Sequence, residues 1–585
     1  MISTQKKTKI VCTVGPSTDK PGILAAMIES GMNVARFNFS HGTHADHAKR
    51  ITLVREAANK AGKHIALMLD TKGPEMRIGK FAENKVMLVA GQSFTLTGQD
   101  IIGTTEMVSV NHKNLAREVS PGTKILLSDG LIELMIDNIE GDAIITTVLN
   151  SGEISNNKRV AVPGVCINLP PVSEQDQADI LFGVEQGMDC IAASFIQQPS
   201  DVLAIRRILE NAKVHMAIIA KIENAPGVTN IDDILKVADG VMVARGDLGV
   251  EIPTEDVPLI QKLLIGKCNQ AGKPVITATQ MLESMMTNPR PTRAEASDIA
   301  NAIMDGTDAI MLSGETASGH YPAEAVNTMQ KIALRTEQNL KYQALRSSEM
   351  KTQHTTTAAI SHASAQIAHE LTASAIITTT QSGYTPRMIS KYRPDSPVIA
   401  VTPSPKTARQ VQLLWGVYPV VYQVSPNSDQ MVDESVRAAL SAGLVQTGDL
   451  VVVTAGVPVG TQGTTNMIRV HLVADVLLRG QGIGEQAVTG KVCVINSPNV
   501  LQDYSPGDVL VTTGIDETIA SYATKAAAII TEEGGLSSNA AIIGINYNLP
   551  AIVGAAGAVD ILKNGTIVTV DASRGLVYAG KTNAR

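Results

Sequence analysis

The chain has 585 residues, a formal net charge of −7 and an apolar fraction of 44%. That length suits roughly three to five domains, and the apolar fraction supports sizeable cores. An acidic balance without a long basic block argues against nucleic acid or an anionic membrane as a partner. The N-terminus has no apolar signal core, and no apolar stretch is long enough to span a bilayer. We therefore expect a cytoplasmic protein, and its five widely spaced cysteines should be reduced and buried.

Strand-like apolar runs alternate with amphipathic helix patterns from Thr8 to about Leu340. The runs are rich in Val, Ile and Ala with little polar alternation, which suits strands buried on both faces. Such a series of βα units predicts a (β/α)₈ barrel over residues 1–72 and 172–345. The eight expected strands are TKIVCTVG, NVARFNFS, HIALMLDT, CIAASFI, HMAIIAKIE, GVMVARGD, PVITATQM and AIMLSGET. The expected helices include 23–30, 174–186, 200–211, 257–271 and 293–304, with others starting near 44 and 322.

Polar residues close six of these eight strands, and in a barrel of this type the carboxyl ends of the strands carry function. Lys221 and Glu223 lie two residues apart on one strand, so their side chains point the same way. Asp247 follows the next strand beside Gly246, where a ligand can approach the bare backbone closely. These three side chains alone are better explained as a buried ion pair near a turn. The remaining strand-end residues change that balance: Arg36, Asn38, Ser40, Asp70, Thr71, Thr279, Ser313 and Glu315.

Residues 73–171 interrupt the barrel pattern after the third strand and are too long for an ordinary βα loop. The segment has its own short strands, separated by Gly and Asn turns, and only a possible helical turn at 111–117. It predicts a small all-β domain that covers the catalytic face as a lid and excludes water. Its strands are KVMLVA, SFTLTG, TKILLS, LIELMID and AIITTVL. Lys158 and Arg159 lie near its return to the barrel.

A second α/β unit is expected over residues 346–474. Its strands are SAIITTT, PVIAVTP, YPVVYQV, LVVVTAG and MIRVHLV, with helices starting near Pro386, Lys406 and Asp429. The turn from Thr378 to Thr385 joins a strand to a helix and is rich in hydroxyls, which suits a phosphate group at a helix N-terminus. The alternative is a plain capped helix start, and the loop 456–463 adds a second segment of similar character.

The last unit, residues 475–585, begins with a polar, Gly-containing segment from Arg479 to Gln486. The remainder predicts a small α/β domain with a helix near 537–546. Its expected strands are KVCVI, DVLVTTG, AAAIIT, AIVGA and TIVTVD.

Seven segments of the first two units, in order, resemble the pyruvate kinase family. They are MNVARFNFSHG, LDTKGPEMRIG, AKIENAPG, MVARGDLGVEI, TATQMLESM, PRPTRAEASDIANAI and MLSGETASGHYP. The resemblance covers residues 8 to about 473 and implies the same architecture, namely a barrel with an inserted β domain followed by a regulatory α/β domain. It implies transfer of the phosphoryl group of phosphoenolpyruvate to ADP, giving pyruvate and ATP, in a homotetramer.

The resemblance also assigns roles to residues of the barrel. Lys221, Arg36 and Thr279 would be catalytic, with Lys221 stabilising the phosphoryl group in flight and Thr279 on the path of the proton. Glu223 and Asp247 would hold Mg²⁺ or Mn²⁺, which prefers carboxylates together with substrate oxygens. The substrate-binding set implied by the resemblance is Arg36, Lys221, Gly246, Asp247 and Thr279, and the nucleotide-binding set is Asn38, Phe39, Ser40, His41, Arg77 and Lys158.

A monovalent-cation site is implied in the same way. Asn38, Ser40, Asp70 and Thr71 would bind K⁺ with oxygen ligands, which suit a hard ion. Glu75 matches the K⁺-dependent form of the family, because K⁺-independent members have a lysine at this position.

The regulatory unit would bind a phosphorylated effector through Thr380, Gln381, Ser382, Gly383, Tyr384 and Thr385. Tyr384 stands where an arginine is commoner in the family, so fructose 1,6-bisphosphate, a sugar monophosphate and AMP all remain open. The last unit resembles the swivelling phosphohistidine domain of phosphoenolpyruvate-utilising enzymes. Asn539 replaces the histidine of that family, and an amide does not accept and pass on a phosphoryl group. This departure favours a structural or regulatory role for the extension.

Two other functions are compatible with parts of the pattern. A barrel lyase or aldolase could use the same pair of carboxylates to stabilise a pyruvate enolate, but Arg77, Lys158 and the lid would then have no task. A catalytically silent metabolite sensor would use the Thr378–Thr385 turn as its main site, and it would predict lesions among the barrel residues. The barrel residues are intact, so a phosphotransferase is the function that we expect.

Overall fold

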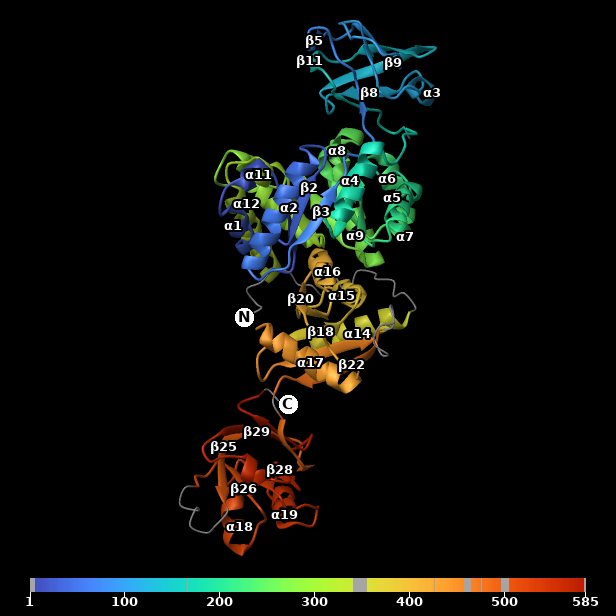
Figure 1. Ribbon diagram of the computed structural model, residues 1–585. Helices are drawn as coiled ribbons and strands as arrows, with labels where there is room; N and C mark the ends of the chain where they lie inside the picture. Colours follow the sequence, from blue (N-terminus) through green and yellow to red (C-terminus); the bar gives the residue numbers. More distant parts are fainter. Residues whose placement is uncertain are drawn as a thin grey trace.

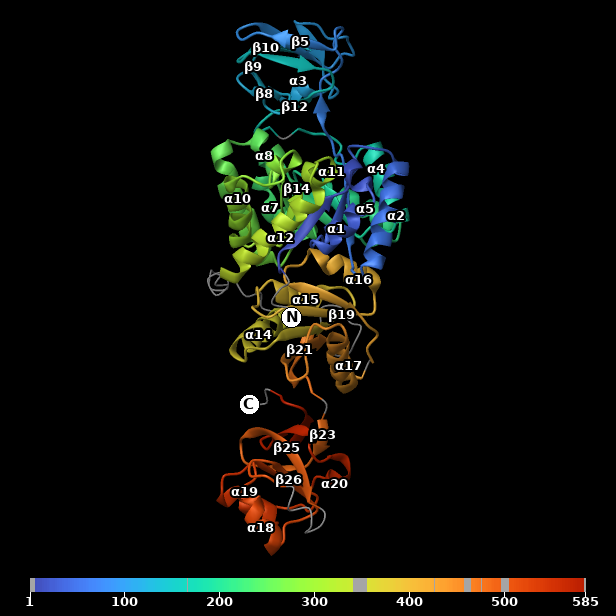
Figure 2. The same cartoon turned by 90° about the vertical axis from the view of Figure 1, so that its left-hand side faces the viewer.

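The computed structural model describes residues 6–165, 167–339, 355–425, 427–456, 465–474, 476–495 and 504–582. Four bodies follow one another along a single long axis (Figure 1). The inserted β domain lies at one end, the barrel and the α/β domain follow, and the C-terminal extension lies at the other end (Figure 2). Within the described ranges, no helix has the length and apolar character needed to cross a bilayer.

The barrel prediction is confirmed, because eight parallel strands close into one sheet. Almost all of their residues are buried, as the continuous apolar runs indicated. The closed order runs β1-β17-β16-β15-β14-β13-β3-β2. The strands are β1 (Lys9–Thr13), β2 (Val34–Asn38), β3 (Ala66–Asp70), β13 (Cys190–Ala193), β14 (Ala217–Ile222), β15 (Gly240–Ala244), β16 (Val275–Ala278) and β17 (Ala309–Leu312).

Eight principal helices surround the barrel, and their ends lie close to the expected positions. Side-chain capping boxes define three of their starts, at Thr43, Ser173 and Thr292. The helices are α1 (Ile23–Glu29), α2 (His44–Lys60), α4 (Glu174–Glu185), α5 (Pro199–Asn211), α7 (Ile231–Val237), α9 (Val257–Ala271), α10 (Arg293–Met304) and α12 (Pro322–Asn339). Short helical segments lie among them: η2 (Pro16–Asp19), α6 (Ala225–Thr229), α8 (Arg245–Glu251), η3 (Thr254–Asp256), η4 (Glu283–Met286) and α11 (Gly314–Ala317).

The inserted domain is a small β structure, as predicted. Its main sheet has the order β4-β12-β8-β9-β10-β6-β7, and β5 pairs with β11 in a second sheet. The chain leaves the barrel through Gly73, which has φ of +74°, and a Cβ there would lie 2.7 Å from the Cβ of Ser194. The elements are β4 (Met76–Arg77), β5 (Lys85–Leu88), β6 (Ser93–Thr97), β7 (Met107–Ser109), α3 (Leu115–Glu118), β8 (Lys124–Leu127), β9 (Ile132–Glu140), β10 (Ala143–Val148), β11 (Gly152–Ser155) and β12 (Arg159–Ala161).

The α/β domain has a sheet of order β20-β19-β18-β21-β22, in which β22 is antiparallel to β21. The predicted strands are present, and the long helix that opens the domain was not predicted. The loop 457–464, most of the second predicted phosphate loop, lies outside the described residues. The elements are α14 (Thr356–Glu370), β18 (Ala375–Thr379), α15 (Tyr384–Ser390), β19 (Val398–Thr402), α16 (Pro405–Gln410), η5 (Val411–Leu413), β20 (Val417–Val421), α17 (Ser428–Ser441), β21 (Leu450–Gly456) and β22 (Thr465–Leu472).

The extension has a mixed sheet of order β23-β30-β29-β25-β26-β27-β28-β24. The segment from Arg479 to Gln486, expected to be a polar connection, supplies strand β24 and the end of β23. Two glycines allow this close packing. A Cβ on Gly482 would lie 1.8 Å from the carbonyl oxygen of Ala572, and a Cβ on Gly480 would lie 2.7 Å from the carbonyl oxygen of Val553. The elements are β23 (Val476–Arg479), β24 (Gln481–Ile483), β25 (Ala487–Ile495), β26 (Val509–Thr512), α18 (Glu517–Ala523), β27 (Ala528–Thr531), α19 (Asn539–Asn546), β28 (Ala551–Val553), α20 (Ala558–Ile561), β29 (Ile567–Asp571) and β30 (Leu576–Ala579).

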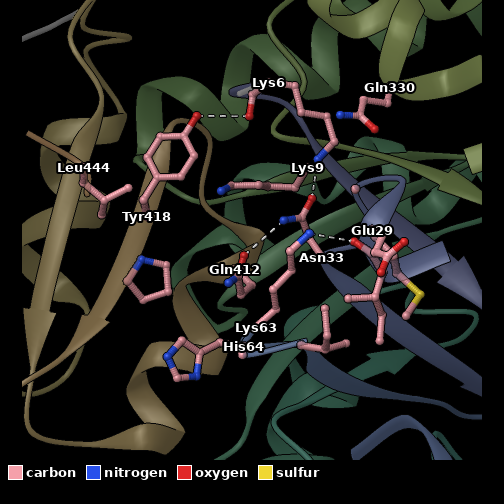
Figure 3. Close-up of a pocket in the computed structure, with 16 residues that line it drawn as sticks. Lys6, Lys9, Glu29, Asn33, Lys63, His64, Gln330, Gln412, Tyr418 and Leu444 are labelled. Carbon is pink, nitrogen blue, oxygen red and sulfur yellow. Dashed lines mark hydrogen bonds between the residues drawn. The ribbon is translucent and has the colours of Figure 1, made fainter. Parts of the chain in front are cut away.

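A cavity of about 290 Å³ lies where the amino ends of the barrel strands meet the α/β domain. Lys6, Lys9 and Lys63 all line it, and Figure 3 shows their side chains gathered around Asn33. Burial lowers the pKa of Lys9 to about 7, and the Lys9 ammonium donates to the carbonyl of Val417 (2.5 Å). The cavity lies at the face opposite the strand ends that carry the predicted catalytic residues, so it is separate from the candidate active site.

Candidate active site

The predicted residues at the strand ends meet at one mouth of the barrel. The carboxylate of Asp70, at the end of β3, accepts from Arg36 Nε (2.6 Å) and from Lys221 Nζ (3.0 Å). Asp70 is 1% exposed, and burial alone would raise its pKa. Arg36 and Lys221 outweigh that effect and lower the pKa of Asp70 overall, so the carboxylate is charged.

Lys221 lies on β14 and Glu223 directly follows it, and their side chains point to the same side, as their spacing predicted. Lys221 Nζ is 3.1 Å from Glu223 Oε1 and donates to Ser194 Oγ (2.7 Å). Burial acts to lower the pKa of Lys221, but Asp70 and Glu223 outweigh it and raise the pKa. The ammonium group is therefore held charged and fully paired at the floor of the mouth.

The Glu223 carboxylate is 1% exposed and also accepts from the backbone N–H of Phe195 (2.6 Å). Burial raises the pKa of Glu223; Lys221 acts against the rise, and the nearby Asp247 carboxylate adds to it. Two close carboxylates of this kind suit a divalent cation, which relieves their mutual repulsion. Among the described residues, no group of three or more His, Cys, Asp or Glu side chains is placed for a metal, so the pair would need oxygens from the substrate.

Asp247 and Gly246 lie directly after β15, in the first turn of α8. The N–H of Gly246 donates to Thr279 Oγ1 (2.8 Å), and the Thr279 hydroxyl donates to the carbonyl of Ala278 (2.6 Å). Thr279 has φ of +70°, which is rare for a β-branched residue and costs about 1–3 kcal/mol. Arg245 holds this strained turn by donating to the carbonyl of Thr279 (2.7 Å). Such strain fits a hydroxyl that must face the mouth of the barrel.

The four residues expected to bind a monovalent cation lie on neighbouring strand ends. Asn38 Oδ1 accepts from Ser40 N (3.1 Å), while the carbonyl of Thr71 accepts from Ser194 Oγ (2.6 Å). Asn38 pairs in register with Asp70 across β2 and β3. The donor set consists of oxygens, which fits a hard monovalent ion.

The expected nucleotide-binding residues divide into two groups. Asn38, Ser40, His41 and Arg77 line a cavity of about 760 Å³ between the barrel and the inserted domain, together with Glu75 and Lys72. Arg77 forms an ion pair with Glu75 (2.6 Å). The Phe39 ring instead stacks on His47, with a centroid distance of 4.2 Å, and is buried in the barrel wall.

The basic pair at the end of the inserted domain has a different arrangement from the one expected. Lys158 is half-buried, and its carbonyl accepts from Ile78 N (2.9 Å). Arg159, for which no role was predicted, reaches the barrel and contacts the carboxylate of Asp247. Alternation along the strand accounts for the difference, since neighbouring side chains point to opposite faces.

Three further residues of the site were missed. Thr13 Oγ1 accepts from Arg36 Nη1 (2.8 Å), and Ser194 accepts from Lys221. The backbone N–H of Phe195 donates to Glu223. All three lie at the carboxyl ends of β1 and β13, the two strands for which no polar end residue was singled out. The rule of polar residues at strand ends, applied to every strand, would have found Thr13 and Ser194, but not Phe195, which acts through its backbone N–H.

The predicted effector residues form a compact turn at the start of α15. Gly383, with φ of +79°, donates from its N–H to Thr380 Oγ1 (2.9 Å), and the carbonyl of Gln381 accepts from Thr407 Oγ1 (2.8 Å). The Arg387 guanidinium lies 5.2 Å from the centre of the Tyr384 ring. A basic group therefore stands beside the turn, although the commoner arginine is missing at 384.

In the extension, Asn539 is the first residue of α19, and its amide donates to the carbonyl of Ile515 (2.7 Å). That hydrogen bond ties α19 to the segment before α18. The side chain at the expected phosphohistidine position therefore forms a structural hydrogen bond.

Comparison with known families covers most of the chain. Residues 5–326 match the family described as "Pyruvate kinase, barrel domain", residues 358–471 match "Pyruvate kinase, alpha/beta domain", and residues 504–575 match "PEP-utilising enzyme, mobile domain". The chain belongs to the pyruvate kinase family. The expected resemblances of both parts are confirmed, and membership of the pyruvate kinase family makes the chain a phosphotransferase.

Relatives within the pyruvate kinase family match the whole chain, including the extension. A pyruvate kinase of Geobacillus stearothermophilus is 53% identical over 98% of this chain and 99% of its own length. One of Bacillus licheniformis is 51% identical over 99% of this chain and 100% of its own. A crystal structure of a pyruvate kinase from Cryptosporidium parvum has a TM-score of 0.77 and 39% identity, and it covers 81% of this chain and 97% of that one.

Proposed function

We propose that this phosphotransferase moves the phosphoryl group of phosphoenolpyruvate to ADP, giving pyruvate and ATP in the last step of glycolysis. The observation that carries the proposal is the convergence of Arg36 and Lys221 on Asp70 beside the carboxylate of Glu223. Two fixed positive charges at the mouth of a barrel suit a substrate that carries a phosphate and a carboxylate.

Lys221 stabilises the phosphoryl group during transfer, and Arg36 binds it. Phosphoryl transfer passes through a loose transition state with charge spread over three oxygens, so catalysis depends on positioned positive charge. Asp70, Glu223 and Ser194 hold the Lys221 ammonium before the substrate arrives, which lowers the reorganisation needed during the reaction.

Glu223 and Asp247 would hold the divalent cation, Mg²⁺ or Mn²⁺. When bound, that cation supplies further positive charge to the oxygens of the substrate. The backbone N–H groups of Gly246 and Asp247 bind the substrate carboxylate, which takes the place of Thr279 Oγ1 as the acceptor of the Gly246 N–H. The Thr279 hydroxyl lies on the path of the proton that converts the enolate to pyruvate. Arg77 and Lys158 bind the nucleotide from the inserted domain, opposite Asn38, Ser40 and His41.

The reaction and its cation requirement can be tested in one assay. Pyruvate formation from phosphoenolpyruvate, ADP and Mg²⁺ should be fast with K⁺ and fall to a small fraction when K⁺ is replaced by a bulky organic cation. We expect this because the oxygen atoms of four residues form a site that suits a hard monovalent ion. These residues are Asn38, Ser40, Asp70 and Thr71. The measurement is the rate of pyruvate release in matched ionic strength.

Two outcomes of this assay would contradict parts of the proposal. Turnover that is equal in both salts would remove the monovalent-cation site while keeping the reaction. No turnover in either salt, with a normal circular dichroism spectrum, would remove the reaction itself.

Regulation by a phosphorylated effector at Thr380, Gln381, Ser382, Gly383, Tyr384 and Thr385 belongs to the same proposal. The hydroxyl-rich turn and the nearby Arg387 guanidinium support an anionic ligand at the start of α15. Tyr384 takes the place of the commoner arginine, so the identity of the effector is open. A sugar monophosphate, fructose 1,6-bisphosphate and AMP should each be tested as effectors. A homotetramer in the cytoplasm is expected on the family resemblance.

The effector site makes a prediction of its own. At least one of the three phosphates should shift the phosphoenolpyruvate saturation curve to lower concentration, and Ser382→Asp should abolish that shift because a new carboxylate repels the phosphate. Phosphoenolpyruvate saturation curves with and without each phosphorylated compound measure the effect. Ser441→Asp, at the end of α17 in the same α/β domain, is the matched control. Curves that none of the three phosphates moves would contradict the regulatory proposal.

A further inference from the structure

Arg159 links the inserted domain to the candidate cation site. It lies on β12, the last strand of the inserted domain, and its side chain is 9% exposed. Its Nη1 contacts Asp247 Oδ1, and its Nη2 lies 3.7 Å from Glu251 Oε1. The proposed function gives this guanidinium no task, although it touches a residue proposed to hold the divalent cation.

Phe195 connects the same guanidinium to the second carboxylate of the site. The Arg159 guanidinium lies 4.8 Å from the centre of the Phe195 ring, within the range of a cation–π contact. The backbone N–H of Phe195 donates to Glu223 Oε2 (2.6 Å). Phe195 has φ of +56°, which is unusual for a bulky residue and is a mark of functional positions. Arg159 therefore contacts Asp247 directly and reaches Glu223 through one intervening residue.

Asp247 and Glu251 give the guanidinium two acceptors on one helix. They lie four residues apart on α8, so they are neighbours on its surface. The Asp247 side chain is 39% exposed, whereas that of Glu251 is 11% exposed. A nearly buried carboxylate gains from a charged partner, so Glu251 can receive the guanidinium when Asp247 is engaged elsewhere. Figure 2 places α8 at the end of the barrel that faces the inserted domain.

We propose that Arg159 is a positioning residue that couples the inserted domain to cation binding. Without the cation its guanidinium rests on Asp247, and when the cation binds the guanidinium moves to Glu251 and carries β12 with it. The inference rests on the proposed cation site at Glu223 and Asp247. Its physical basis is that two cations compete for one carboxylate and repel each other at short range.

Mn²⁺ binding to the full chain without substrates tests the competition. Free Mn²⁺ measured by electron paramagnetic resonance gives the dissociation constant for the wild type, Arg159→Gln and Arg159→Lys. Arg159→Gln should bind Mn²⁺ about threefold to tenfold more tightly, since a competing charge is removed from a partly exposed site. Arg117→Gln, the same change at an exposed position on α3, should bind Mn²⁺ like the wild type.

The coupling between cation binding and the inserted domain is tested by measuring movement of that domain. A change of charge alone would not alter this movement. Fluorophores on cysteines introduced at Lys113 and Lys60, both exposed, report the distance between the inserted domain and α2. Mg²⁺ should change energy transfer in the wild type and in Arg117→Gln. The change should be lost in Arg159→Gln and partly restored in Arg159→Lys.

The outcomes separate this inference from the proposed function. Glu223→Gln that loses Mn²⁺ binding, together with Arg159→Gln that matches the wild type in both measurements, would overturn the role of Arg159 alone. Glu223→Gln that binds Mn²⁺ like the wild type would overturn the cation site and, with it, the role of Arg159. If Arg159→Gln binds Mn²⁺ more tightly but keeps the Mg²⁺-dependent change in energy transfer, Arg159 has only a charge effect. That result would overturn the coupling.

Discussion

Replacement of Lys221 by methionine should lower kcat by about 10³-fold or more, the scale seen when a positive charge that stabilises phosphoryl transfer is removed. The KM for phosphoenolpyruvate should change little, because the charge is needed mainly in the transition state. Arg36 stays on Asp70 in this variant and continues to bind the phosphate. Steady-state rates of pyruvate formation measure both constants.

The Lys221 variant needs a stability control, since its ammonium neutralises two buried carboxylates. Removing one partner of a buried ion pair can cost about 3–5 kcal/mol. Thermal unfolding of the variant should therefore accompany the kinetics, and Lys236→Met, at an exposed lysine paired with Asp233, serves as the matched control. A folded Lys221→Met protein with near-normal turnover would contradict the role given to Lys221.

Replacement of Glu223 by glutamine should weaken divalent-cation binding and lower kcat/KM by about 10²-fold or more, because several kcal/mol of charge stabilisation is lost. Glutamine keeps the shape of the side chain, and its amide oxygen can still accept from the N–H of Phe195. The loss of charge is thus separated from the loss of packing. Mn²⁺ binding and steady-state kinetics with varied Mg²⁺ measure the two effects.

The control for Glu223 is the same substitution at Glu185, an exposed residue at the end of α4. Glu185→Gln should leave both Mn²⁺ binding and turnover unchanged. If Glu223→Gln keeps the Mn²⁺ affinity of the wild type, Glu223 does not hold the cation. If it loses Mn²⁺ affinity but saturating Mg²⁺ restores full turnover, the residue binds the cation without a share in the transition state.

Much of the barrel could be predicted because its signals are local. Strands buried on both faces read as unbroken apolar runs, and capping residues such as Thr43, Ser173 and Thr292 mark helix starts. The short strands β4, β7 and β12 were missed, since two or three residues carry no visible alternation. Strands β23 and β24, of four and three residues, were missed because the glycines around them favoured a connection.

In the candidate site too, some features could be predicted from the sequence and others could not. The sequence predicted that Lys221 and Glu223 share one side of a strand, because side chains alternate with a period of two. It also determined the chemical types at the other strand ends. The pairing of the charges could not be predicted, because Asp70 and Lys221 are 151 residues apart and meet only where the barrel closes. Likewise, Arg159 and not Lys158 contacts Asp247, 88 residues away, since the pairing depends on how β12 is set against α8. Coulomb interactions act through space, so their partners follow from the closed fold rather than from neighbouring residues in the chain.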